Sequence, residues 1–353
     1  MRQESFRTRP GRRHALALGL SAAVAACAPG ARRPRPFNGK LLDHEFPALA
    51  YRARPGAFNA AIFDLQTNAA WYWNISKPFP LEGAFILPVA VSALAELEAA
   101  RLQLTERVTV RGTDLSPPYS LISQSWQETP PNFAMNVSVA DLIALAVQYN
   151  DNTAADVLMK LIGGPGAVTA WLRAKGLDVM RIDRYAREVE VMISGMASFR
   201  AQWRTPAAFA AAREATPVGE RQDAMEAYLD DPRDTTSAQD AIAFLVQLAR
   251  NQMISQASAN VLFKTMSQTR NGAGLLAAGL PPGAAFVHKA GLSVSDLGFT
   301  PAYSDLGLVT FKDGRRFAMA AFLAGSTASP TDREHLFADA ARLMVRAAGQ
   351  ADR

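Results

Sequence analysis

Residues 81–101 read LEGAFILPVAVSALAELEAAR, and this stretch predicts a helix that is too apolar to lie on a protein surface. Apolar residues and alanines cover most of the helix circumference, and the charged side chains of its second half are confined to residues 96–101. We therefore expect a helix from about Leu87 to Arg101 in the core of the molecule. Its N-terminal end is the buried end, and a functional site would form there.

Strand signals lie near both ends of the long central part of the chain. Two β-prone runs, Phe58–Leu65 and Ala69–Asn74, are joined by Gln66-Thr67-Asn68, which predicts a hairpin. Three further runs predict antiparallel strands near the C-terminus, at residues 286–288, 305–311 and 317–323. A capped helix that begins at Thr331 is expected to close the chain.

Helical signals fill the stretch between these strands. Ser138 and Asp141 form a capping box that opens a helix, and the helical pattern breaks at residues 150–152. We therefore expect an α/β chain of the two-lobed α+β type, in which both ends share one antiparallel sheet flanked by helices. The predicted sheet lobe comprises residues 41–80 and 235–353, and the inserted helical lobe comprises residues 81–234.

The composition is that of a folded globular protein. The chain has 353 residues, of which 49% are hydrophobic and 20% are charged. Its formal net charge of +5 arises outside the expected domain, because residues 1–26 and residues 28–40 each contribute +4. Residues 41–353 therefore carry −3, which gives no support to a nucleic-acid partner.

The first 27 residues are typical of an export signal. Arg12 and Arg13 precede a short apolar run, HALALGLSAAVAAC, that is too short to span a bilayer. Small residues stand directly before Cys27, the single cysteine, and this ending resembles a bacterial lipobox. The resemblance implies a periplasmic or cell-envelope lipoprotein that an acylated Cys27 anchors to a membrane. Residues 28–40, rich in Pro and Arg, predict an extended tether.

Two alternatives stay open for this leader. The signal can be an ordinary cleaved one in which Cys27 is incidental. The paired arginines resemble a twin-arginine signal, but any export signal has a basic start, so the export route is not fixed by the sequence.

Five stretches occur in an order that resembles the class A serine β-lactamases and the related penicillin-binding proteins. They are FILPVAVSALAELE (85–98), YNDNTAADVLMKLI (149–162), IDRYAREVE (182–190), DPRDTTS (231–237), and HKAG (288–291) followed by YSDLGLVTF (303–311). The resemblance covers about residues 41–348 and implies the two-lobed fold with a cleft between its lobes.

The family keeps its reactive groups in the motifs S-x-x-K, S-D-N and K-T-G and in a loop glutamate, and this chain departs from each of them. Gly83 and Ile86 stand at the serine and lysine of S-x-x-K, so the nucleophile and a proton acceptor are missing. Asn150 replaces the serine of S-D-N, and Ala186 replaces the loop glutamate. In the stretch 289–291 the threonine of K-T-G has become alanine.

The resemblance therefore implies a divergent family member whose acyl-transfer chemistry is lost. Removal of the nucleophile alone costs a comparable serine hydrolase on the order of a million-fold in turnover. We expect a catalytically inactive binding or scaffold protein. A hydrolase of β-lactams or of another amide or ester is the alternative, with Ser76 or Ser120 as a displaced nucleophile, and a purely structural envelope lipoprotein is a third reading.

The frame of a binding cleft survives these replacements. The expected ligand-binding residues are Asn150, Asn152, Lys289 and Gly291. Lys289 would point a cation into the cleft or would pair with Asp151 or a neighbouring carboxylate, and either Glu188 or Glu190 would add a carboxylate. We expect a peptidoglycan-like or carboxylate-bearing small ligand and neither a cofactor nor a metal. His288 lies next to Lys289 on the same predicted strand, so it faces the opposite side and should be packed.

The segment between Glu190 and Asp231 is much longer than in typical relatives and is expected at the rim of the cleft. Its apolar residues include Met192, Phe199, Trp203, Phe209 and Met225. These side chains can cover the site or contact a partner, and the alternative is a helical hairpin packed on its own lobe.

Processing of the leader gives the first testable prediction. The mature protein is expected to begin at Cys27 and to carry lipid, as mass spectrometry of the N-terminus would detect. Cys27→Ser should leave the protein either unprocessed or soluble, because the acylated thiol is gone. An unmodified N-terminus at another residue would contradict the lipobox interpretation.

Overall fold

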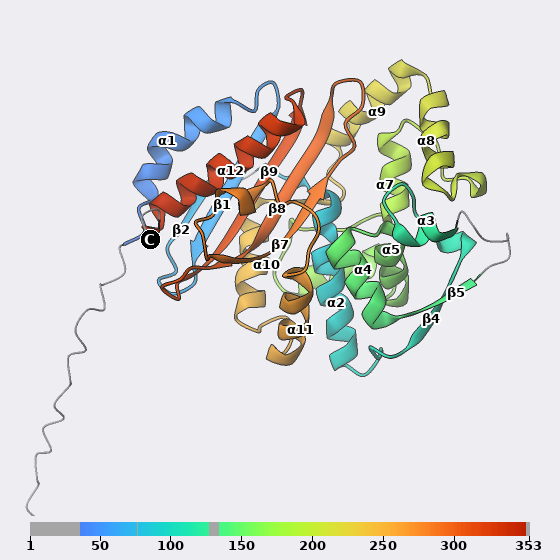
Figure 1. Cartoon of the computed structure of the whole chain (residues 1–353), viewed down its shortest axis with the longest axis horizontal. Helices are drawn as coiled ribbons and strands as arrows, with labels where there is room; N and C mark the ends of the chain where they lie inside the picture. Colours follow the sequence, from blue (N-terminus) through green and yellow to red (C-terminus); the bar gives the residue numbers. More distant parts are fainter. Residues whose placement is uncertain (1–35, 76, 127–133, 351–353) are drawn as a thin grey trace, which may run out of the picture. The chain divides into compact units, whose positions relative to one another are not determined.

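A computed structural model of the chain describes residues 36–75, 77–126 and 134–350 (Figure 1). The export signal, Cys27 and most of the tether lie outside the described residues, as does Ser76. Within the described ranges, no helix combines the length and the apolar character needed to cross a membrane.

The C-terminal strands and the N-terminal hairpin form one antiparallel sheet of five strands in the order β2-β1-β9-β8-β7. The strands are β1 (Ala57–Asp64), β2 (Ala70–Trp73), β7 (Ala285–Leu292), β8 (Thr300–Thr310) and β9 (Arg316–Ser326). Strand β1 pairs along its whole length with β9, so that Ala60 lies opposite Ala321. The prediction that both ends of the chain share one sheet is therefore confirmed.

Two helices cover one face of this sheet (Figure 1). They are α1 (Gly39–Tyr51) and α12 (Pro330–Ala347). Phe58 of β1 joins them, because its ring lies 5.8 Å from that of Phe46 and 5.2 Å from that of Phe337. Helix α1 begins inside the predicted tether, since the side chain of Asn38 accepts a hydrogen bond from the Leu41 amide and caps the first turn.

The other face of the sheet packs against the core that contains α2 (Ile86–Glu98) and α10 (Ala238–Ala249). All nine residues from Ile86 to Leu94 are buried, as the apolar sequence predicted. They share a hydrophobic cluster with Phe322 of β9 and with the helices of the second lobe. Burial of whole side chains such as Leu87 stabilises the fold by about 1.5–3 kcal/mol each.

The helical lobe surrounds α2. It contains α3 (Leu121–Ser125), α4 (Val139–Tyr149), α5 (Asn152–Leu161), α6 (Pro165–Ala174), α7 (Ala186–Ile193), α8 (Pro206–Ala215) and α9 (Val218–Asp230). Helix α11 (Gln256–Met266), from the predicted sheet lobe, packs against α2 and α4 as well as β7. Contacts therefore cross the predicted boundary between the lobes.

Short strands and 3-10 turns complete the structure. They are the pair β3 (Phe79–Pro80) and β6 (Thr235–Thr236), the pair β4 (Arg107–Arg111) and β5 (Ala134–Ser138), and the turns η1 (Glu82–Phe85), η2 (Gly112–Asp114), η4 (Ala201–Trp203) and η5 (Leu276–Gly279). The pair β3–β6 holds the entrance of α2 in place, because Leu81 also donates its amide to the Asp234 carbonyl.

Candidate functional site

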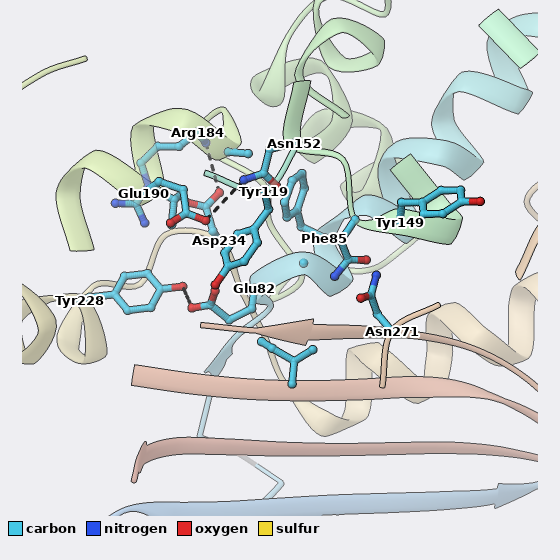
Figure 2. Close-up of a pocket in the computed structure, with 15 residues that line it drawn as sticks. Glu82, Phe85, Tyr119, Tyr149, Asn152, Arg184, Glu190, Tyr228, Asp234 and Asn271 are labelled. Carbon is cyan, nitrogen blue, oxygen red and sulfur yellow. Dashed lines mark hydrogen bonds and ion pairs between the residues drawn. The ribbon is translucent and has the colours of Figure 1, made fainter. Parts of the chain in front are cut away.

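A pocket of about 130 Å³ opens at the N-terminal end of α2, where the sequence predicted a site (Figure 2). Turn η1, the break between α4 and α5, helix α7 and helix α9 all contribute side chains to it. The lining residues are Glu82, Gly83, Phe85, Tyr119, Tyr149, Asn150, Asn152, Arg184, Ala186, Val189, Glu190, Tyr228, Asp234, Asn271 and Leu292. None of them is a serine, threonine, cysteine, lysine or histidine.

The place of a side chain at position 83 is already occupied. A Cβ atom added at Gly83 would lie 2.7 Å from Nδ2 of Asn150, which is closer than atoms normally approach. That nitrogen donates to the Ala290 carbonyl at 3.1 Å, so it is fixed in this position. Asn150 can hold its side chain there because it adopts the left-handed conformation, with φ of 56°, at the end of α4.

The break between α4 and α5 depends on Asp151, which is 1% exposed. Its carboxylate accepts hydrogen bonds from the Ala154 amide at 2.9 Å, the Ile122 amide at 3.0 Å and the Ser120 hydroxyl at 2.9 Å. Ser120 in turn caps α3 and does not line the pocket. This geometry gives no support to Ser120 as a displaced nucleophile, and Ser76 lies outside the described residues.

Lys289 does not point into the pocket, and it does not pair with Asp151. Its side chain is fully buried, and Nζ donates to the carbonyls of Ala146 and Val147 at 3.3 and 3.1 Å. The ammonium thus binds the unpaired carbonyls near the end of α4, where a positive charge is favourable. Burial lowers the pKa of Lys289 to about 7. The cleft-facing reading and the pairing with Asp151 were wrong because the carbonyls of α4 were not considered as partners, whereas a neighbouring carboxylate, Asp305, does interact with Lys289 electrostatically.

The other residues named from sequence divide between pocket and core. Ile86 is fully buried in the core, whereas Ala186 and Asn152 line the pocket. Gly291 lies against the backbone of η1, and an added Cβ atom would come within 2.7 Å of the Ala84 nitrogen, so it makes room rather than contacting a ligand. His288 is packed as predicted, with Nδ1 2.7 Å from Oδ1 of Asp305.

Two glutamates give the pocket an unusual electrostatic character (Figure 2). The carboxylate of Glu82 accepts a hydrogen bond from the hydroxyl of Tyr228 at 2.6 Å, and Glu190 accepts one from Asn152 at 3.4 Å. Burial raises the pKa of Glu82, and burial together with the charge of Glu82 raises the pKa of Glu190 to about 8. At neutral pH, Glu190 is therefore mainly protonated.

The pocket wall behind Glu190 is held by a buried ion-pair network. Nε of Arg184 donates to Asp234 at 2.5 Å, and its Nη1 donates to Asp231 at 3.0 Å. Arg184 and Asp234 are 7% and 6% exposed, so their charges compensate each other away from bulk water. Removing Arg184 or Asp234 alone would leave the other charge buried without this partner. The ion pair therefore holds this wall in place.

The long segment between Glu190 and Asp231 packs on its own lobe and also contributes a side chain to the pocket. Val191, Met196 and Phe209 form a small hydrophobic cluster of their own, as a hairpin packed on its own lobe would. Helix α9 also brings Tyr228, which is 1% exposed, to the pocket. Sequence reasoning missed Tyr228 because no motif near it indicates a pocket residue. Glu82 could have been predicted as a pocket residue, because it directly precedes Gly83.

Chemically, this arrangement offers carboxyl groups, amides and aromatic rings, and its lining contains no serine, threonine or cysteine. The hydroxyl beside a carboxylate is that of Tyr228, whose pKa is raised by burial. Among residues 36–75, 77–126 and 134–350, no group of three or more His, Cys, Asp or Glu side chains is placed to hold a metal ion. Asn150 Oδ1 and Asn271 Nδ2 have no hydrogen-bond partner in the described structure, so an acceptor and a donor stay unpaired on the pocket wall.

Comparison with known proteins points to one family. Residues 42–348 match the model of the β-lactamase enzyme family. β-Lactamase VEB-1 of Pseudomonas aeruginosa is 23% identical over 294 residues, which cover 83% of this chain and 85% of that protein. Extended-spectrum β-lactamase PER-1 of the same organism is 26% identical over 270 residues, covering 76% of this chain and 75% of that protein.

The fold is also found in solved structures. A β-lactamase from Chitinophaga pinensis superimposes with a TM-score of 0.69 at 23% identity, covering 87% of this chain and 98% of that chain. This likeness supports the two-lobed fold that the sequence predicted.

The contact between Gly83 and Asn150 predicts that the two positions are coupled. Gly83→Ser alone is expected to destabilise the protein by about 1–3 kcal/mol, because the new side chain overpacks against the Asn150 amide. Asn150→Ser should relieve this cost in the double variant, as chemical denaturation of the single and double variants would measure. Additive effects of the two changes would contradict the steric account.

Glu190 predicts a pH dependence of stability. The folded protein keeps a proton on Glu190 up to about pH 8, whereas the unfolded chain releases it near the ordinary pKa of 4.5. The group therefore lowers the free energy of unfolding as the pH rises between these values. Glu190→Gln cannot titrate, so its stability relative to the wild type should increase from pH 5 to pH 8. Glu188→Gln, at an exposed position of the same helix, is the control, and parallel curves for wild type and Glu190→Gln would contradict the raised pKa.

Proposed function

The chain belongs to the β-lactamase enzyme family, and we propose that it uses the cleft of that family to bind a small ligand without a covalent step. One observation carries the proposal: the Asn150 amide fills the space that a side chain at position 83 would need. Acyl transfer in this family requires a serine nucleophile, and the lining of the pocket contains no serine, threonine or cysteine.

The pocket favours an amine over a carboxylate. Glu82, Glu190 and Asp234 line it together with a single cation, Arg184, which is already engaged by two aspartates. Lys289, which would have attracted a carboxylate, is bound to backbone carbonyls instead. Above about pH 8, where Glu190 is ionised, a carboxylate-bearing ligand would be repelled by it, whereas an ammonium would find a partner.

Aromatic and amide groups narrow the ligand class further. Phe85, Tyr119 and Tyr149 line the pocket, and aromatic faces attract organic cations. Asn152 and the unpaired atoms of Asn150 and Asn271 can hydrogen-bond a peptide group. We infer a peptide-like ligand with a free amine, which keeps the expected peptidoglycan-like character but reverses the expected charge.

The leader adds a cellular setting to this proposal. A lipid-anchored protein exported by the signal at residues 1–27 would present the pocket in the cell envelope. In that compartment, peptide-like amines of the cell wall are within reach of a tethered domain. The inactive site would then act as a receptor rather than as an enzyme.

The test has a covalent and a non-covalent arm. Full-length protein is incubated with a fluorescent penicillin and with a chromogenic cephalosporin, and neither an adduct nor turnover above background is expected. In parallel, calorimetry compares a short lysyl peptide amide with the same peptide after its amines are acetylated and its C-terminus is left as a carboxylate. The amine-bearing peptide should bind more tightly, and more so at pH 8.5 than at pH 6.5, because Glu190 releases its proton.

Matched variants locate the binding. Glu190→Gln should weaken the amine-bearing peptide about tenfold and remove most of its pH dependence, since a charge-assisted hydrogen bond is lost. Glu188→Gln, exposed on the same helix, should leave the affinity unchanged. Penicillin labelling or hydrolysis would overturn the inactive-site proposal, and tighter binding of the acetylated peptide would overturn the amine preference.

A further inference from the structure

A second cavity, of about 760 Å³, lies next to the pocket and shares Arg184 with it. Helix α7, turn η2 and the segment at residues 196–204 form its walls, on the flank of the long segment that follows α7. We call it the arginine groove, after Arg184, Arg187, Arg204 and Arg233 on its walls.

Two of these guanidinium groups converge on turn η2. Nη1 of Arg187 donates to the Thr113 carbonyl at 2.8 Å, and its guanidinium lies 5.4 Å from the centre of the Phe199 ring. Arg204 approaches the same turn, because a Cβ atom built on Gly112 would lie 3.3 Å from its Nη1. Both cations therefore line the groove near turn η2.

The other two arginines of the groove are already ion-paired. Arg184 is bound by Asp231 and Asp234, and Arg233 is also bound by Asp231. Asp183 pairs with Arg181, and Glu188 accepts a hydrogen bond from the Tyr185 amide at the start of α7.

The two converging cations, in contrast, make no ion pair among the described residues, although Asp156 interacts with Arg187 at longer range. Within the part of the chain that the structure describes, neither Arg187 nor Arg204 has a carboxylate at ion-pair distance. Nε of Arg204 and Nη2 of Arg184 are both buried without a hydrogen-bond partner in the described structure. Arg184 is only 7% exposed. Buried guanidinium N–H groups without acceptors are costly, and an oxyanion is the ligand whose geometry satisfies them.

Apolar side chains line the groove beside these donors. Val191, Met192, Met196 and Phe199 line it, and methionine side chains adapt readily to a flexible hydrophobic ligand. We propose that the arginine groove binds an amphiphilic anion, a carboxylate or phosphate carried on an apolar chain. This second site would bind an anion, whereas the neighbouring pocket is proposed to bind an ammonium.

Calorimetry of the full-length protein tests the proposal with four probes below their micelle concentrations. Decyl phosphate and decanoate are expected to bind, and inorganic phosphate should bind at least tenfold more weakly because it leaves the apolar side chains unused. Decyltrimethylammonium should not bind. If decyl phosphate binds more tightly than decanoate, a phospholipid-type headgroup is the favoured source of the anion, and the reverse order favours a fatty-acid carboxylate.

Variants assign the binding to the groove. Arg187→Gln and Arg204→Gln should each weaken decyl phosphate at least tenfold, whereas Arg200→Gln, a neighbouring exposed arginine that does not line the groove, should not. Should an arginine variant unfold, the exposed groove residue Ser198 offers a second pair of changes: Ser198→Glu should weaken binding and Ser198→Lys should strengthen it.

Three results would overturn the proposal. The first is the absence of binding by both decyl anions. The second is equal binding of decyltrimethylammonium, which would show hydrophobic adsorption only. The third is an affinity that Arg187→Gln, Arg204→Gln and the Ser198 variants leave unchanged.

Discussion

A single buried carboxylate, that of Asp151, fixes one wall of the cleft. It accepts hydrogen bonds from the chain before α3 and from the first turn of α5, so it ties two segments far apart in sequence to the end of α4. Burial raises the pKa of Asp151, yet these donors satisfy its oxygens. Because Asp151 is held, the residues on either side of it are held too: Asn150 faces Gly83 and Asn152 faces Glu190.

The charged and polar groups of the cleft that results differ from those that a serine hydrolase needs. A serine hydrolase of this fold needs cations and hydroxyls around its nucleophile, and the pocket offers carboxyl groups, amides and aromatic rings. Lys289, at the position of the lysine in K-T-G, contributes to the fold, because it satisfies carbonyls of α4 that would otherwise be buried without a donor. A residue kept from a catalytic motif can thus be explained by structure alone.

Sequence reasoning reached the fold because periodicity reports burial directly. The unbroken apolar stretch of α2 and the paired β runs leave few arrangements that hide all their apolar faces, and the predicted sheet follows from them. Gly83 and Ala186, placed by the register of the neighbouring motif residues, both line the pocket. Lys289 was misplaced because a sequence does not show which of several acceptors lies within reach. Tyr228 could not be found at all, since it reaches the pocket through the packing of α9 and not through any local pattern.

The contact between Gly83 and Asn150 also bears on how such a chain can change. Restoring a hydroxyl at position 83 meets the amide of Asn150, and replacing Asn150 first removes its hydrogen bond to the Ala290 carbonyl. Each single step toward serine at these two positions therefore passes through a less stable protein, although the two steps together need not. Two residues that fit each other in this way resist replacement one substitution at a time.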